Sequence, residues 1–281
     1  NVGIVAKSNF QSLMDHVGSG SAYDLSKRRS NLSILPPYDG KAFSSFVETI
    51  YNMHGYIEHC REEYVLISQG NVITNIDYTD VFDFHSKKKA DITLIYKNHA
   101  IPQGYDRPIT LDVDNDGKVN QIFVKPGVVD KGVFNHAYGS ILIKKDLLMS
   151  EIRNAISVNQ LDVRRLIQSS LGKYSIYAYE NKGYCAAISS INDYFEFNMD
   201  LMKKEVRDEL FNPQRPIYTK VRDDAPAKYG IDADVKNSLV ADGCVIEGTV
   251  ENCVLFRGVK IEKGAKVKNC ILMQDTTVGA K

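Results

Sequence analysis

The chain lacks a net charge, a long apolar run and a recognisable leader. Lys and Arg together number 35, as do Asp and Glu, so the formal net charge is zero. The composition therefore imposes no basic face that would attract nucleic acid. No apolar run approaches the roughly 18 residues that cross a bilayer. No signal peptide is visible at Asn1. We predict a cytoplasmic protein with neither nucleic acid nor a membrane as partner.

Cysteine is also scarce. The five cysteines are odd in number and follow no spacing typical of a metal site or a disulfide framework. Buried free thiols in a reducing cytoplasm are favoured over redox activity. An initial Met is lacking as well, and a strand pattern begins at once. We therefore expect the natural N-terminus to lie upstream of Asn1.

One stretch, residues 63–78, organises the rest of the chain. Its run Tyr64-Val65-Leu66-Ile67-Ser68 is typical of a short buried strand in a mostly parallel sheet. In open α/β sheets, ligands bind beyond the carboxyl ends of the strands. Gln69, Gly70 and Asn71 follow this strand directly, so we predict that they lie where a ligand would bind.

Strand and helix patterns alternate over most of the chain, which predicts an α/β domain. Ser190 with Asp193 is typical of a helix start. The predicted strands cover residues 2–6, 64–68, 92–96, 135–143 and 174–179. The predicted helices cover residues 10–17, 43–57, 77–89, 147–156 and 191–202, with another around residues 166–167.

Two segments have both a structural and a ligand-binding interpretation. Gly18 and Gly20 follow a predicted helix, where a C-cap and turn is the commoner role. Residues 112–117, DVDNDG, fit the first half of a calcium-binding loop, but the twelfth position is Phe123 instead of Glu. Apolar alternation on both sides predicts two strands joined by a hairpin turn at Asn115-Asp116-Gly117, and we favour this turn over calcium.

Beyond a connector that contains three prolines, the apolar period changes to six residues. Such a period in two registers is typical of hexapeptide repeats in a parallel β-helix. We predict an α/β domain at residues 1–216, a linker at 217–230 and an incomplete β-helix domain at 231–281. The two registers are Leu255, Ile261, Val267 and Met273, and Cys253, Val259, Ala265, Ile271 and Thr277.

Several segments, in order, resemble the glucose-1-phosphate adenylyltransferase (ADP-glucose pyrophosphorylase) family. Gly70-Asn71-Val72 and Ile76-Asp77-Tyr78 stand where the family has Gly-Asp-His and Met-Asp-Tyr. Residues 12–25 resemble the family's Ser-Leu…His-Ile…Gly segment with its downstream Trp-Asp-Leu. Residues 123–126 resemble Phe-Val-Glu-Lys-Pro, and residues 183–191 resemble Gly-Tyr-Trp-x-Asp-(Val/Ile)-Gly-Thr-Ile.

The resemblance implies a Rossmann-like nucleotidyltransferase (GT-A-like) α/β domain followed by a left-handed parallel β-helix. In the family, glucose 1-phosphate attacks ATP to give ADP-glucose and pyrophosphate, and magnesium neutralises charge on the phosphates. The substrate-binding positions that the resemblance implies in this chain are Gly18, Gly20, Gly70, Asn71, Asp77 and Lys125.

The chain departs from the family at the charged positions. Asn71 and Ala187 stand where the family has its two metal-binding carboxylates. Magnesium prefers anionic oxygen ligands, so we predict weak or absent metal binding and assign no catalytic residue. Val124 replaces the Glu that would contact the sugar. Residues 45–48 are bulky where the family has Gly-Thr-Ala-Asp, which argues against the usual nucleotide pose.

These departures favour a non-catalytic subunit that regulates a catalytic adenylyltransferase subunit within a hetero-oligomer of bacterial glycogen synthesis. A sugar-phosphate or nucleotide ligand is expected from the resemblance. The first alternative is an active adenylyltransferase with a displaced metal site, which would need a carboxylate such as Asp77 or Glu48. The second is a hexapeptide acyltransferase, but its coils would carry a catalytic His and no His follows His136.

Overall fold

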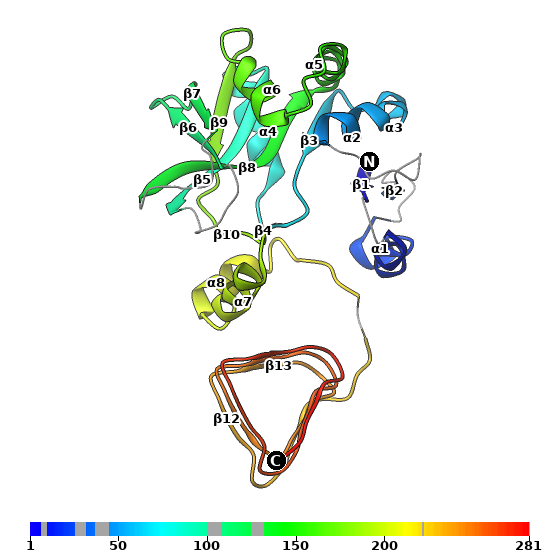
Figure 1. Cartoon of the computed structure of the whole chain (residues 1–281), viewed down its shortest axis with the longest axis vertical. Coiled ribbons are helices and arrows are strands. Elements are labelled where there is room, and N and C mark those ends of the chain that lie inside the picture. Colours follow the sequence, from blue (N-terminus) through cyan, green and yellow to red (C-terminus); the bar gives the residue numbers. More distant parts are fainter. Residues whose placement is uncertain are drawn as a thin grey trace. The chain divides into compact units, whose positions relative to one another are not determined.

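The computed structural model describes residues 1–6, 10–25, 32–36, 45–100, 108–124, 132–220 and 222–280 (Figure 1). The chain forms two compact units. The first comprises Asn1–Val72 and Ile76–Cys185, and the second comprises Ile73–Asn75 and Ala186–Lys281. No helix of the described ranges is both long and apolar enough to cross a membrane. The domain limits predicted from the sequence stay a prediction.

A six-stranded sheet forms the centre of the first unit, and its longest strand is β8 (Val133–Lys144). One edge of β8 pairs antiparallel with β5 (Ile92–Ala100). The other edge pairs antiparallel with β3 (Tyr64–Ile67) and β6 (Ile109–Val113). The sheet continues on either side with the antiparallel strand β7 (Val119–Val124) beside β6 and the parallel strand β9 (Ile176–Glu180) beside β5.

The prediction that β3 is a buried strand of a mostly parallel sheet is wrong. Among the described strands of this sheet, only β5 and β9 pair in parallel. Leu66 is 36% exposed, and the other residues of β3 are half-buried. Val65 and Ile67 pack against the main core on one face of the sheet, whereas Leu66 points to the other face. An apolar run therefore occurs here in a strand that is covered fully on neither face.

The predicted hairpin is confirmed, because β6 and β7 pair antiparallel across it. Gly117 closes the turn with a φ of 86°, a conformation that glycine adopts without strain. Asp114 Oδ1 accepts hydrogen bonds from the backbone N–H groups of Asp116 and Lys118, both at 2.9 Å. One carboxylate of the calcium-like segment therefore stabilises the turn itself.

Helices cover both faces of the sheet, as Figure 1 shows. On one face, Val81 of α4 (Tyr78–Lys88) packs with Ile95 and Leu142. The main core lies on the other face, where Val47 and Ile152 are almost fully buried. Four helices contribute to this core: α2 (Phe46–Asn52), α3 (His54–His59), α5 (Lys145–Ser157) and α6 (Val163–Ser169).

Reciprocal capping boxes begin two helices. Ser45 Oγ accepts a hydrogen bond from Glu48 N, and Glu48 Oε2 accepts one from Ser45 N, both at 3.1 Å. Ser190 and Asp193 make the same pair at α7 (Ile191–Asp200), which confirms the predicted helix start. The single helix predicted over residues 43–57 is divided at Met53, where α2 ends and α3 begins.

The N-terminal part of the first unit forms a small parallel sheet of β1 (Val2–Val5) and β2 (Leu32–Leu35). Between these strands lie α1 (Phe10–Val17) and the 3₁₀ turn η1 (Ser21–Tyr23).

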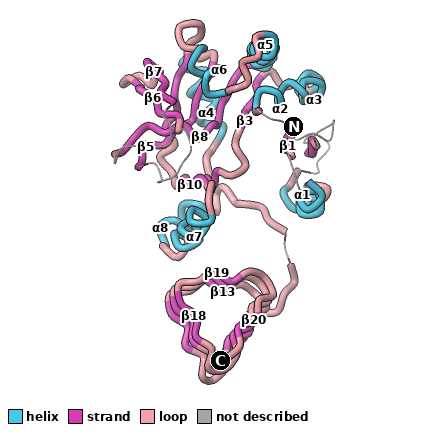
Figure 2. Tube along the Cα trace, viewed as in Figure 1, coloured by secondary structure: helices cyan, strands magenta, loops and turns pink. Residues whose placement is uncertain are grey.

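The second unit contains a parallel β-helix, so the predicted fold class is confirmed. Figure 2 shows its short strands stacked in coils. The strands form three parallel sheets with orders β11-β14-β17-β20, β12-β15-β18 and β13-β16-β19. The unit also contains α7 and α8 (Lys204–Leu210). Strand β4 (Val72–Thr74) pairs with β10 (Cys185–Ala187), and all but the first residue of each belongs to this unit. The strands of the coils are β11 (Lys228–Tyr229), β12 (Asp234–Lys236), β13 (Leu239–Val240), β14 (Val245–Ile246), β15 (Thr249–Glu251), β16 (Val254–Leu255), β17 (Lys260–Ile261), β18 (Lys266–Lys268), β19 (Ile271–Leu272) and β20 (Thr277–Val278).

Apolar side chains stack in columns inside the coils, but the coils are unequal in length. Val250 pairs with Val235, 15 residues earlier, and with Val267, 17 residues later. The six-residue spacing therefore does not hold along all the coils. Leu272, not Met273, pairs with Leu255, and Met273 is 51% exposed. The prediction that Met273 continues the interior column is wrong.

The coils differ in length at one corner. The corner at Gly248 is two residues shorter than the corresponding corners before and after it. A Cβ on Gly248 would lie 2.4 Å from Ala265 O and 2.8 Å from Glu262 O. The two longer corners meet across the short one, where Lys263 Nζ lies 2.8 Å from Asp232 Oδ2.

A ladder of asparagines forms a second corner. Asn237, Asn252 and Asn269 have φ values of 41°, 52° and 52°, a left-handed conformation that favours Gly and Asn. Asn237 Nδ2 donates to Asn252 Oδ1 at 2.7 Å, and Asn252 Nδ2 donates to Asn269 Oδ1 at 3.2 Å. A search at six-residue spacing does not detect this ladder, because its members are 15 and 17 residues apart.

Asn252→Ala should destabilise the β-helix by about 2 kcal/mol, because alanine is strained at this φ and makes no ladder hydrogen bond. Asn252→Gly loses the same hydrogen bonds without the strain and should cost about 1 kcal/mol less. Urea unfolding of the intact chain would measure both. A glycine variant less stable than the alanine variant would contradict this account of the corner.

Candidate functional site

The exposed turn after β3 lies against β8. Ser68 Oγ is 3.1 Å from Ser140 Oγ, within hydrogen-bond distance. Gln69 covers Gly139, where a Cβ would lie 2.3 Å from Gln69 Nε2. Gly139 has a φ of 76° and lies at a bulge, where the β5–β8 register shifts between Ile95 and Tyr96. This glycine lets the turn approach the sheet closely.

Gly70 and Asn71 precede β4, and Asp77 follows it by three residues, while their role in ligand binding stays a prediction. Gly70 and Asn71 are exposed at the turn that enters β4. Asp77 is the N-cap of α4, and its Oδ1 accepts a hydrogen bond from Thr79 N at 2.8 Å. A cap with this geometry stabilises the helix and uses one carboxylate oxygen.

Gly18 and Gly20 shape the turn after α1. Gly18 N donates to Met14 O at 2.8 Å, and Gly18 has a φ of 56°, which is typical of a helix C-cap. Gly20 has a φ of 79°, and a Cβ there would lie 2.9 Å from Leu32 Cδ2. Both glycines thus have a structural role, which was the commoner interpretation of the pattern. Their role in substrate binding stays a prediction.

The remaining predicted positions lie elsewhere. Lys125 lies outside the described residues. Ala187 is the last residue of β10 and is 5% exposed. Strand β10 pairs with β4, the strand that follows Asn71, and the boundary between the two compact units runs through both strands.

Sequence reasoning missed a polar cluster on the sheet. Lys97 and His99 alternate along β5, and His136 lies on the adjacent strand β8, so all three share one face. Tyr138 Oη and His136 Nδ1 lie 2.5 Å and 3.3 Å from His99 Nε2. The rings of His136 and Tyr138 are 4.4 Å apart. The period-two spacing of His136 and Tyr138 in a predicted strand was the available signal.

The cluster contains one cation among neutral groups. Burial, and to a smaller extent the neighbouring His99, lowers the pKa of His136 to about 3. Burial, followed by the charge of Lys97, also lowers the pKa of His99. Burial raises the pKa of the Cys185 thiol to about 11. Lys97 Nζ donates to Lys182 O at 2.7 Å and to Gly183 O at 2.5 Å, which fixes the turn that leads to Cys185.

The residues at the two family metal positions do not fit magnesium. Asn71 offers a neutral amide oxygen, and Ala187 offers no ligand atom, whereas magnesium requires hard oxygen donors that are usually anionic. The carboxylates of Asp77 and Glu48 cap helices. Within the described ranges, no three His, Cys, Asp or Glu side chains are grouped so that they could hold a metal ion.

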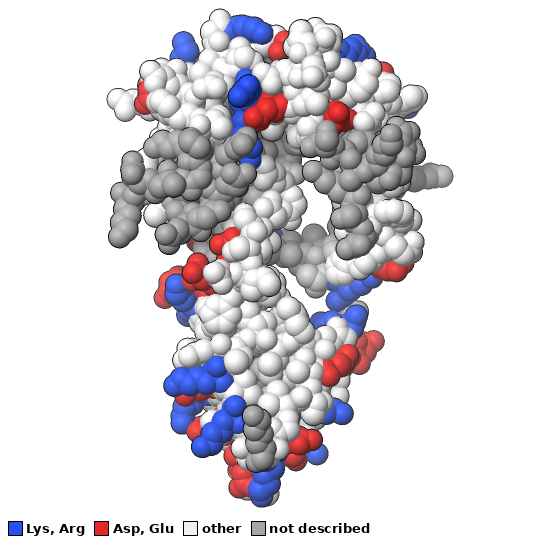
Figure 3. Space-filling view, in the orientation of Figure 1, with Lys and Arg blue, Asp and Glu red and all other residues white. Residues whose placement is uncertain are grey.

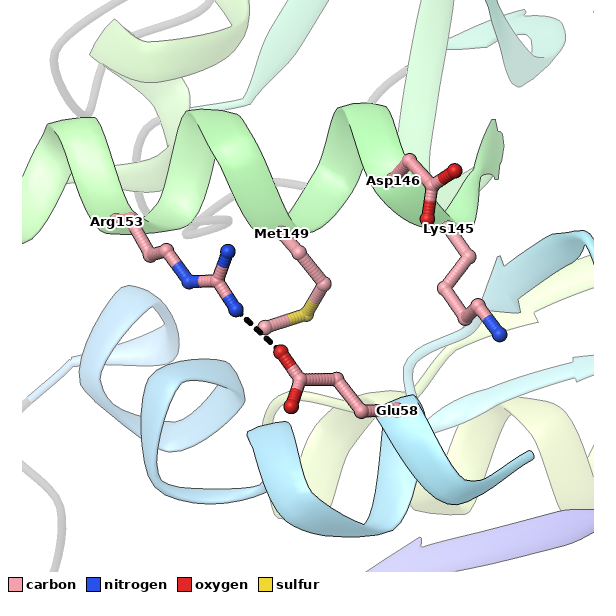
Figure 4. Close-up of a pocket in the computed structure, with 5 residues that line it drawn as sticks. All are labelled: Glu58, Lys145, Asp146, Met149 and Arg153. Carbon is pink, nitrogen blue, oxygen red and sulfur yellow. Dashed lines mark hydrogen bonds and ion pairs between the residues drawn. The ribbon is translucent and has the colours of Figure 1, made fainter.

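A depression of ≈ 390 Å³ lies between α3 and α5 (Figure 4). Glu58 comes from α3, whereas Lys145, Asp146, Met149 and Arg153 come from α5. Arg153 forms an ion pair with Glu58 across it, and Lys145 Nζ donates to Cys60 O at 2.8 Å. None of the predicted site residues lines this depression, so we assign it to helix packing.

All five cysteines are free thiols. Cys244 and Cys253 are buried in the β-helix, whereas Cys60, Cys185 and Cys270 are half-buried. The prediction of buried thiols therefore holds for two positions, and the other three lie nearer the surface.

The structure thus defines a protein with a mixed α/β unit and a C-terminal parallel β-helix. Residues 224–281 match the family model described as GlmU-like, C-terminal hexapeptide. The glycogen biosynthesis protein GlgD of Bacillus subtilis (strain 168) is 32% identical over 272 residues, which cover 95% of this chain and 68% of that protein. The glycogen biosynthesis protein GlgD of Geobacillus stearothermophilus is 37% identical over 277 residues, which cover 95% of this chain and 68% of that protein.

A glucose-1-phosphate adenylyltransferase of Clostridium perfringens (strain 13 / Type A) is 32% identical over 291 residues, which cover 99% of this chain and 72% of that protein. The chain belongs to the glucose-1-phosphate adenylyltransferase family, as the resemblance of its motifs predicted.

Stability should fall as the pH is lowered from about 6.5 toward 3. The unfolded state protonates His136 near pH 6.5, whereas the folded state keeps this buried ring neutral down to about 3. Each pH unit in this window should cost up to about 1.4 kcal/mol through this residue. Urea unfolding at several pH values would test this. His136→Gln should show a shallower pH dependence than the parent, and an identical slope would contradict the assignment.

Proposed function

We propose that this chain is a non-catalytic, regulatory subunit of a cytoplasmic glucose-1-phosphate adenylyltransferase that serves glycogen biosynthesis. The observation that carries this proposal is the pair Asn71 and Ala187, where the family has metal-binding carboxylates. The family reaction depends on neutralising charge on the transferred phosphates, and this pair contributes no negative charge. Relatives named as glycogen biosynthesis proteins support the pathway.

An active enzyme with a displaced metal site is less well supported. The carboxylates it would need, Asp77 and Glu48, each accept hydrogen bonds from backbone N–H groups at a helix start. Recruiting either one for a metal would compete with a helix cap that contributes about 1 kcal/mol. The regulatory assignment requires no such rearrangement.

A chain that retains the fold without the metal ligands can still act through assembly. We propose that it joins a catalytic adenylyltransferase subunit and alters that subunit's rate or its response to effectors. Such a shift requires contacts that differ between the active and less active states of the catalytic subunit. Gly18, Gly20, Gly70, Asn71, Asp77 and Lys125 are the positions proposed to contact a retained sugar-phosphate or nucleotide ligand.

The chain alone should form ADP-glucose at least a thousandfold more slowly than a catalytic family member, because two anionic metal ligands are missing. Pyrophosphate release from ATP and glucose 1-phosphate with magnesium would measure this. The double variant Asn71→Asp, Ala187→Asp should recover part of the rate, and Asn98→Asp at an exposed position of β5 is the matched control. A typical family rate from the unmodified chain would refute the proposal.

Mixed with a catalytic family member from the same cell, the chain should co-elute in size-exclusion chromatography and change that enzyme's KM or kcat. The reason is that a regulatory subunit acts only by binding one functional state of its partner better than another. Independent migration at micromolar concentration, with unchanged kinetics, would remove the regulatory assignment.

A further inference from the structure

Residues 71–77, which include the predicted substrate-binding positions Asn71 and Asp77, pass from one compact unit to the other and back. Asn71 and Asp77 belong to the first unit, whereas Ile73–Asn75 between them belongs to the second. Two residues of extended chain span only about 7 Å, so the covalent links on either side of this segment have little slack. Whatever holds Ile73–Asn75 therefore also limits where Asn71 and Asp77 can lie.

Asn75 anchors this segment to the end of α8. Its Nδ2 donates to Leu210 O at 2.7 Å and to Arg215 O at 2.9 Å. Leu210 is the last residue of α8 and is 1% exposed. Carbonyl groups in the last turn of a helix lack intrahelical donors, so the side-chain amide provides a bond that the helix cannot. Both N–H groups of the amide are used.

Further contacts within the second unit continue from α8 toward the coils. Arg207 Nη1 donates to Leu201 O at 2.7 Å and to Met202 O at 2.6 Å, which fixes α8 to the end of α7. Tyr194 of α7 donates a weak hydrogen bond from Oη to Met273 Sδ of the β-helix at 3.9 Å. The helices α7 and α8 thus link the Asn75 anchor to the β-helix.

We propose that Asn75 is a positioning residue that couples the second unit to the candidate site. A displacement of α8 is transmitted through the Asn75 amide to β4, and from there along the chain to Asn71 and Asp77. This coupling does not depend on whether the chain is catalytic. The competing account is that the backbone pairing of β4 with β10 alone holds the segment.

Hydrogen–deuterium exchange of the intact chain, followed by mass spectrometry, distinguishes these accounts. Asn75→Asp keeps the side-chain shape but removes both N–H donors, so exchange should rise roughly tenfold in residues 71–77 and in residues 204–216. Exchange in β5, residues 92–100, should not change. The matched control Asn98→Asp removes the donor of an exposed Asn98–Asn135 pair at 2.7 Å and should leave both segments unchanged.

A substitution at the end of α8 tests the coupling in the opposite direction. Leu210→Ala should raise exchange in residues 71–77 as well as in 204–216, and should add little to residues 71–77 when Asn75 is already Asp. If Asn75→Asp also raises hydrogen–deuterium exchange in β5, the milder variant Asn75→Gln should raise exchange only in residues 71–77 and 204–216. A rise confined to residues 71–77, or a Leu210→Ala effect that never reaches them, would overturn the proposal.

Discussion

The pairing of β8 with three other strands is the constraint on which the first unit depends. Because β5 occupies one edge and β3 and β6 share the other, β8 fixes where each of these strands ends. The bulge at Gly139, where no Cβ is present, leaves room for the side chain of Gln69. His136 and Tyr138 lie on the same strand, so the polar cluster and the turn before Asn71 are placed by one element.

The electrostatics around the candidate site differ from those of a phosphoryl-transfer centre. The cluster on β5 and β8 has neutral imidazoles and one cation, Lys97, which is bound to carbonyl oxygens. The Asp77 carboxylate, which follows β4, caps helix α4. A helix cap needs only an acceptor of the right shape, whereas a metal site needs several anionic oxygens at fixed distances. The fold therefore uses the Asp77 carboxylate as a cap and requires no carboxylate at Asn71 or Ala187.

Local patterns predicted more of the structure than non-local ones. The helix start at Ser190, the turn at Gly117 and the C-cap at Gly18 were all predictable, because each depends on hydrogen bonds within a few residues. The orientation of β3 was not, because an apolar run of four residues fits either face and either direction of pairing. The contact of Asn75 with Leu210 could not be inferred either, since nothing local to Asn75 indicates a partner 135 residues away.

The short corner at Gly248 has a consequence for how this β-helix can vary among relatives. Its backbone lies directly beneath the corner at Ala265, and the longer corners close over it through Asp232 and Lys263. An insertion at Gly248 would have to separate those corners and push a new side chain into occupied space. The longer corners are open to solvent, so they can accept added residues without disturbing the interior columns. Length changes at this corner should therefore be tolerated in the coils before and after Gly248 and excluded at Gly248 itself.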